Sequence, residues 1–83
     1  MKIEILPEIV EEVSDAVSQS VYDTIGVLYD EFGTVPEKGS LIKVDLFGFI
    51  YEYKLADKKY EFNGNEQALK ITLVFKHTNS YEN

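Results

Sequence analysis

PEIVEEVSDAVSQSVYDTIGVLYDEFG, residues 7–33, is the stretch that decides the fold. Its large apolar residues recur at intervals of three or four, which is the spacing of one face of an α-helix. Pro7 suits the first turn of a helix, where its missing N–H costs nothing, and Gly33 suits the C-terminal cap. The pattern predicts one helix over about residues 8–32. Its expected buried face consists of Val10, Val13, Val17, Val21, Ile25, Leu28 and Phe32.

Strand signals follow the helix. Residues 41–55 are rich in β-branched and aromatic side chains and alternate with period two. The apolar register changes at Gly48, which indicates a bulge or a sharp bend. Residues 56–59 are interpreted as a turn. Asn63 and Gly64 form a strong hairpin signal, because both residues tolerate positive φ.

The remaining segments complete the fold prediction. A short strand containing Tyr60 and Phe62 leads to a last strand over about residues 68–77, where apolar and polar residues alternate. Residues 2–6 alternate weakly, which allows a short edge strand, and residues 78–83 are interpreted as a polar tail. The sequence therefore predicts an α+β fold in which one long N-terminal helix packs on a three-stranded antiparallel meander, in the order βαβββ if residues 2–6 pair. The other sheet face would meet water or a second subunit.

Length and composition restrict the classes of function. The chain has 83 residues, which is enough for one domain with a modest core but leaves little room for a deep active-site cavity. It contains no Cys, which excludes a thiolate nucleophile and favours the cytoplasm. Its first residues lack the apolar region of a signal peptide. No stretch reaches the roughly 20 apolar residues that span a bilayer.

No residue pattern indicates catalysis, a metal ion or a cofactor. His77 is the only histidine, so no second His or Cys can complete a triad or a zinc site with it. We interpret it as a partly exposed structural residue. Residues 57–66 contain oxygen ligands but lack the ligand order of a calcium loop, and no phosphate-binding or dinucleotide motif occurs. We therefore expect a protein that is not an enzyme.

Charge is distributed unevenly along the chain. Eight lysines, no arginine and 15 acids give a net charge of −7. Residues 1–37 carry −8, and residues 38–83 carry +1. The acidic balance and the absence of arginine argue against direct binding of nucleic acid.

The acidic residues of the predicted helix form the first candidate binding surface. Surface helices usually mix Lys with Glu at i, i+4, yet no Lys occurs between Pro7 and Glu37. A solvated face, with first-turn acids favoured by the helix dipole, is the ordinary explanation. A face for a cationic partner is the functional alternative. Its residues would be Glu8, Glu11, Glu12, Asp15, Asp23 and Asp30.

The strand aromatics form the second candidate surface. Packing under the helix is their ordinary role. Because the register changes at Gly48, one cluster can instead lie away from the helix, and exposed Tyr and Phe are good interface anchors. Self-association, for instance as a C2 homodimer, is then expected through Phe47, Phe49, Tyr51 and Tyr53.

In size, acidity, absence of Cys and layout, the chain resembles small phage-encoded proteins that bind and block host proteins. Some of these inhibitors imitate DNA by displaying carboxylates to a DNA-binding protein. The resemblance implies a viral protein in the host cytoplasm whose acidic helix face occupies a basic host protein, such as a DNA-binding one, without a cofactor. The alternative hypothesis is a small structural or assembly protein, such as a virion or complex component, that self-associates through its aromatics.

Overall fold

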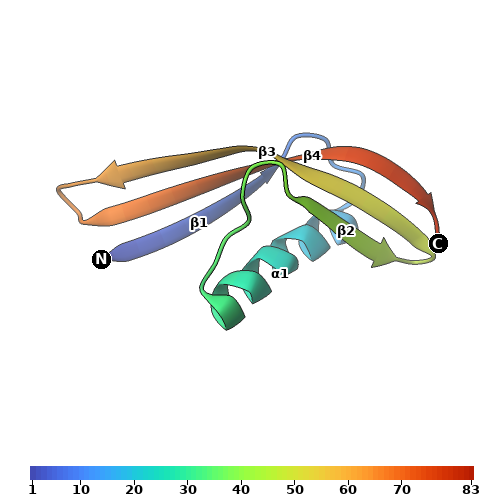
Figure 1. Cartoon of the computed structure of the whole chain (residues 1–83), viewed down its shortest axis with the longest axis horizontal. Coiled ribbons are helices and arrows are strands. Elements are labelled where there is room, and N and C mark those ends of the chain that lie inside the picture. The colour runs from blue at the N-terminus through green and yellow to red at the C-terminus, as the bar shows by residue number, and fades with distance from the viewer.

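The computed structural model describes residues 1–83 as one helix packed on one face of a four-stranded sheet (Figure 1). The α+β fold and the βαβββ order that the sequence predicts are confirmed. The elements are β1 (Lys2–Ile9), α1 (Asp15–Phe32), β2 (Leu41–Leu46), β3 (Phe49–Asn63) and β4 (Ala68–Glu82).

The sheet is built around a long hairpin of β3 and β4, each of 15 residues. The strand order is β1-β4-β3-β2, and β1 runs parallel to β4 while the other neighbours are antiparallel. β1 pairs with the first half of β4 and β2 with the first half of β3, so the two edge strands lie at opposite ends of the hairpin (Figure 1). The molecule is consequently elongated, with extents of 48 × 23 × 21 Å.

Helix α1 begins seven residues later than predicted. Ser14 has extended backbone angles, and its hydroxyl accepts a hydrogen bond from the Val17 N–H at 3.3 Å, so Ser14 is the N-cap. Val10 and Val13 precede this cap and are exposed, so their prediction as buried helix residues was wrong. The residues before them pair with β4 as a full strand instead of the short one that the sequence allowed.

Pro7 lies in the edge strand β1 and not in the first turn of a helix. The Val10 N–H donates to the Phe75 carbonyl of β4 at 2.9 Å, and the Lys2 N–H donates to the Gln67 carbonyl, one residue before β4, at 3.1 Å. Alternate residues of a strand donate to the same neighbour, so the nitrogen of Pro7 faces the open edge. A missing N–H costs no ladder hydrogen bond at that position.

The C-terminal end of α1 follows the prediction in its cap but not in its packing. Gly33 has φ 64°, and its N–H donates to the Tyr29 carbonyl at 2.9 Å. Phe32, predicted to be buried, is exposed, because this end of α1 diverges from the sheet (Figure 1).

The strand boundaries differ from the prediction at two places. Phe47 and Gly48, with φ of 54° and 84°, form a two-residue hairpin turn between β2 and β3, where the sequence indicated a bulge or bend within one strand. Residues 56–59, predicted as a turn, continue β3 through a bulge at Ala56. The predicted tail, residues 78–83, is strand as far as Glu82. The hairpin at Asn63 is confirmed, and the Asn63 side chain accepts from two backbone N–H groups of the turn. The expectation of positive φ at Asn63 and Gly64 was wrong, because positive φ occurs at Gln67 instead, at the end of a longer turn over residues 64–67.

One cluster of ten buried apolar side chains forms the core between α1 and the sheet. The helix contributes Val17, Val21 and Ile25, as the sequence predicted, while Leu28 is half-buried. The strands contribute Ile42, Val44, Tyr53, Leu55, Ile71, Leu73 and Phe75.

The core assignment predicts different costs for two truncations. Leu73→Ala removes a fully buried side chain and should lower the free energy of unfolding by about 2–5 kcal/mol. Val27→Ala, on the helix surface at 56% exposure, is the control and should change it by less than about 0.5 kcal/mol. Urea unfolding followed by circular dichroism measures both. Equal losses would show that α1 packs on the sheet through another face.

Candidate functional site

The structure separates the acids that the sequence placed in one row on a helix. Glu8 lies in β1 and, since strand side chains alternate, it points away from the α1 side that Ile9 faces. Glu11 and Glu12 lie in the connection between β1 and α1. Asp15 is the first residue of α1. The predicted acidic helix face therefore lacks Glu8, Glu11 and Glu12, because α1 begins after these residues.

A different acidic surface takes its place. We define the acidic segment as residues 10–36, which hold six acids and no lysine. All six are exposed, and none is within 4.0 Å of a cation. Along α1, Asp23 and Asp30 are separated by about 20° around the axis and so share one side of the helix. The six acids are Glu11, Glu12, Asp15, Asp23, Asp30 and Glu31.

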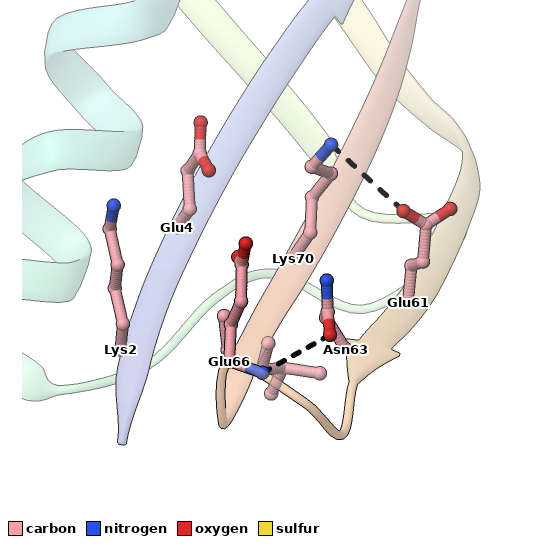
Figure 2. Close-up of a pocket in the computed structure, with 8 residues that line it drawn as sticks. Lys2, Glu4, Glu61, Asn63, Glu66 and Lys70 are labelled. Atoms are coloured by element: carbon pink, nitrogen blue, oxygen red, sulfur yellow. Dashed lines mark hydrogen bonds and ion pairs between the residues drawn. The ribbon is translucent and has the colours of Figure 1, made fainter.

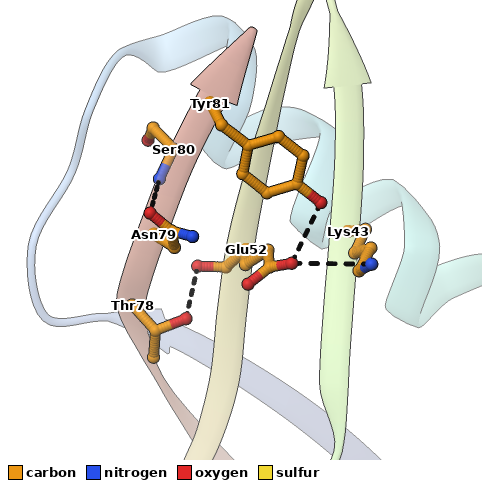
Figure 3. Close-up of polar contacts among 6 residues, drawn as sticks. All are labelled: Lys43, Glu52, Thr78, Asn79, Ser80 and Tyr81. Atoms are coloured by element: carbon orange, nitrogen blue, oxygen red, sulfur yellow. Dashed lines mark hydrogen bonds and ion pairs between the residues drawn. The ribbon is translucent and has the colours of Figure 1, made fainter. Parts of the chain in front are cut away.

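Every ion pair in the structure has its lysine on a strand. Lys43 lies 3.5 Å from Glu52, which also accepts a hydrogen bond from the Tyr81 hydroxyl at 3.1 Å (Figure 3). The Tyr81 hydroxyl, and after it Glu52, raise the pKa of Lys43. Exposed pairs of this kind contribute little to stability, because water screens them. The other three pairs are Lys58–Glu37, Lys59–Asp57 and Lys70–Glu61.

A shallow groove lies on the sheet face away from α1, near the tip of the β3–β4 hairpin (Figure 2). Its charges largely compensate one another, as in the 3.9 Å pair of Lys70 with Glu61. No three His, Asp or Glu side chains of the chain are grouped in a way that could hold a metal ion. The groove therefore offers neither a metal site nor a field of one sign. Its charged members are Lys2, Glu4, Glu61, Glu66 and Lys70.

The predicted self-association residues divide between core and surface. Tyr53 is 0% exposed, so its prediction as a contact residue was wrong, and Tyr51 packs against the core. Phe47 and Phe49, at the β2–β3 turn, are exposed. Phe47 is 85% exposed and also has positive φ, a conformation that a bulky residue adopts only at a cost of about 1–3 kcal/mol.

A second pair of exposed aromatics lies at the other end of the sheet. Tyr60 and Phe62 pair across the hairpin with Ile71 and Leu69, which belong to the face that α1 covers. Both remain exposed because α1 does not extend that far. From the sequence, packing under the helix was their ordinary expected role, because a period-two pattern shows which face a residue occupies but not whether a helix covers it.

His77 has a structural environment. Its Nε2 lies 2.6 Å from the Ser80 hydroxyl, and its ring packs 5.4 Å from the ring of Tyr53. It is half-buried, in agreement with the interpretation from sequence. No carboxylate or second histidine forms a hydrogen bond with it, so the ring lacks the partner that a catalytic histidine normally has.

Comparison with protein-family models, curated proteins and solved structures found no significant match. The single helix is too polar to cross a membrane. The acidic segment and the exposed aromatics are therefore the features from which a function can be argued.

The buried hydroxyl of Tyr53 generates a prediction about stability and pH. This hydroxyl makes no hydrogen bond, and burial raises the pKa of Tyr53 above its ordinary value of 10.0, with only partial opposition from the nearby Val13 N–H. Tyr53→Phe removes an unsatisfied polar group, so it should be neutral or stabilise the fold by up to about 1 kcal/mol.

Tyr53→Phe should also reduce the loss of folding stability that occurs as the pH rises into the alkaline range. Because the folded-state pKa is raised, the unfolded chain releases the proton first, and stability present below about pH 10 is lost as the pH rises above it. Chemical unfolding from about pH 9 to pH 11 measures the slope, and Tyr22→Phe, at a half-buried position on α1, is the control. A steeper loss in Tyr53→Phe than in wild type would contradict the assignment.

Proposed function

We propose that the protein is a non-enzymatic binding protein that places its acidic segment against a basic surface of another protein. The observation that carries the proposal is a difference in charge pairing between the acids of the strands and loops and those of the acidic segment. Four strand or loop acids are neutralised by lysine, while the six acids of the acidic segment have no cation among them. The carboxylates of a surface without lysine repel one another slightly, and a cationic partner would remove that repulsion.

Electrostatic attraction of this kind acts mainly on specificity and association rate. A cluster of exposed charges of one sign steers a complementary partner and loses this effect as salt rises. If the basic surface normally holds nucleic acid, its occupation inhibits that binding by competition. The inhibitor function that the resemblance to small phage-encoded proteins implies is therefore retained as part of the proposal.

The spacing of the carboxylates favours a basic protein surface over strict imitation of DNA. Asp15, Asp23 and Asp30 follow one another at about 10–12 Å along the helix axis. Phosphates of one DNA strand follow at about 3.4 Å along the duplex axis. The acidic segment is thus sparser than a phosphate backbone, and we propose lysine- and arginine-bearing protein surfaces as its class of partner.

Charge reversal inside the acidic segment, compared with charge reversal outside it, tests the proposal. Glu11, Asp23 and Asp30→Lys should abolish salt-sensitive capture of a basic protein from a bacterial lysate. The matched control is Glu4, Glu8 and Glu66→Lys, which makes the same change in net charge on exposed residues outside the acidic segment and should leave capture intact. Immobilised protein, elution with rising salt and mass spectrometry provide the measurement. If both triple variants lose the partner equally, net charge and not the acidic segment is responsible.

A second candidate function, self-assembly, is favoured by Phe47. This side chain is 85% exposed and occupies a turn position that Asn or Gly adopts without strain. Both the exposure of Phe47 and its positive φ lower the stability of a single chain. Such a residue is expected where a second copy of the chain covers it. Phe49, the first residue of β3 after this turn, is exposed as well.

Phe47→Asn separates the effect of Phe47 on the stability of the monomer from its proposed role in assembly. It should raise the free energy of unfolding of the monomer by about 1 kcal/mol, because Asn-Gly suits a turn with two positive φ angles. If Phe47 mediates assembly, the same variant should sediment as a monomer at concentrations where wild type forms a larger species. Phe62→Asn, at the other end of the sheet, is the control. A monomeric wild type, or loss of assembly in the control alone, would exclude an interface at the β2–β3 turn.

A further inference from the structure

Three lysines line one pocket beside the middle of β3. Lys38, Lys54 and Lys76 line a concavity of about 370 Å³. Gly39, Leu55 and Ala56 complete its wall, and no acid contributes to it. In a chain with 15 acids and eight lysines, a pocket whose charged lining residues are all lysines is the opposite of what the composition favours.

The lysines are placed against one another and not against carboxylates. Lys54 and Lys76 are direct cross-strand partners in the β3–β4 ladder. Like charges at such positions destabilise a sheet. None of the three lysines takes part in an ion pair, whereas four of the other five do.

The acids nearest in sequence to the pocket form ion pairs with lysines outside it. Glu37 lies 3.3 Å from Lys58, and Asp57 lies 3.7 Å from Lys59. Glu52 interacts with Lys43 and with the Tyr81 hydroxyl (Figure 3). The positive charge of the pocket is therefore not compensated by these neighbouring carboxylates.

Backbone geometry builds the pocket. β3 carries a bulge in which Ala56 has no partner on β4, and bulges commonly redirect side chains beside functional sites. The connection from α1 to β2 is fixed to this bulge, because the Gly39 N–H donates to the Leu55 carbonyl at 2.8 Å and the Leu55 N–H donates to the Ser40 carbonyl at 2.9 Å. Gly39 has φ 95°, which side chains rarely tolerate. These contacts hold the loop that bears Lys38 against β3.

We propose that this pocket binds a small phosphate-bearing anion. Lysine ammonium groups bind phosphate as point charges, and an anion between Lys54 and Lys76 would replace their repulsion by attraction. The volume lies at the lower end of small-molecule pockets, about 300–1,000 Å³. The net charge of −7 repels a long polyanion, so the ligand is a phosphate group on a small molecule and not a nucleic acid strand.

Titration with two phosphate sources tests the site. Sodium phosphate and ATP, added separately at low ionic strength, should shift the backbone amide signals of Gly39, Leu55 and Ala56 saturably in two-dimensional NMR spectra. Tighter binding of ATP than of phosphate identifies a phosphorylated small molecule as the ligand, and equal affinity identifies the phosphate group alone. The Lys54→Gln, Lys76→Gln double variant should weaken both by about tenfold or more.

Matched controls make the result decisive. Lys59→Gln with Lys70→Gln removes the same charge from lysines that are already paired with acids, and its affinity should equal that of wild type. Sodium chloride at the same ionic strength should give no saturable shift. The proposal is overturned if wild type shows no saturation, if the Lys54/Lys76 variant binds as well as wild type, or if the control variant is weakened equally. Tighter binding of a thymidine oligonucleotide at the same residues would also overturn it, in favour of a nucleic acid strand.

Discussion

The difference in length between the helix and the strands determines which apolar side chains of the sheet are buried and which stay exposed. An 18-residue helix is about 27 Å long, whereas a 15-residue strand extends about 50 Å. One such helix cannot cover the inner face of the β3–β4 hairpin. Burial is therefore concentrated in the middle of the sheet, around Leu55, Leu73 and Phe75, which are completely buried. Aromatic side chains stay exposed at both ends, with Phe47 at one and Phe62 at the other.

The second feature of the structure is the separation of charge between its parts. The acidic segment contains no lysine, and most strand lysines are paired with strand or loop acids. Two groups of unpaired charge each have one sign: the six acids of the acidic segment are negative, and the three lysines of the pocket around Lys54 and Lys76 are positive. A protein of net charge −7 can thus offer surfaces to two kinds of partner, because local charge and not the total decides what binds at short range.

Several positions violate local rules of stability, and they coincide with the proposed surfaces. Phe47 has positive φ and is exposed, and Lys54 faces Lys76 across two strands. Natural sequences tend to break such rules at functional positions and compensate elsewhere. Here the compensation is the buried centre of the sheet. The unsatisfied hydroxyl of Tyr53 also breaks a rule, but it lies inside the core, so it can act on stability and not on a partner.

The sequence by itself determined the features that depend on neighbours along the chain. The apolar stripe of Val17, Val21 and Ile25, the cap at Gly33 and the turn at Asn63 follow from local periodicity and turn chemistry, and the structure contains all of them. The βαβββ order follows from the sequence of these local signals.

Tertiary structure decided what depends on distant partners. Residues 8–14 fit the helical period as well as α1 does, and only pairing of β1 with β4, together with the Ser14 cap, ends the helix there. The acidic row predicted around Glu8 disappeared for that reason. The pocket could not be predicted, because the bulge at Ala56 sets the register that places Lys54 opposite Lys76. These lysines are 22 residues apart in the chain, and no local pattern in the sequence encodes a pairing that only the assembled sheet creates.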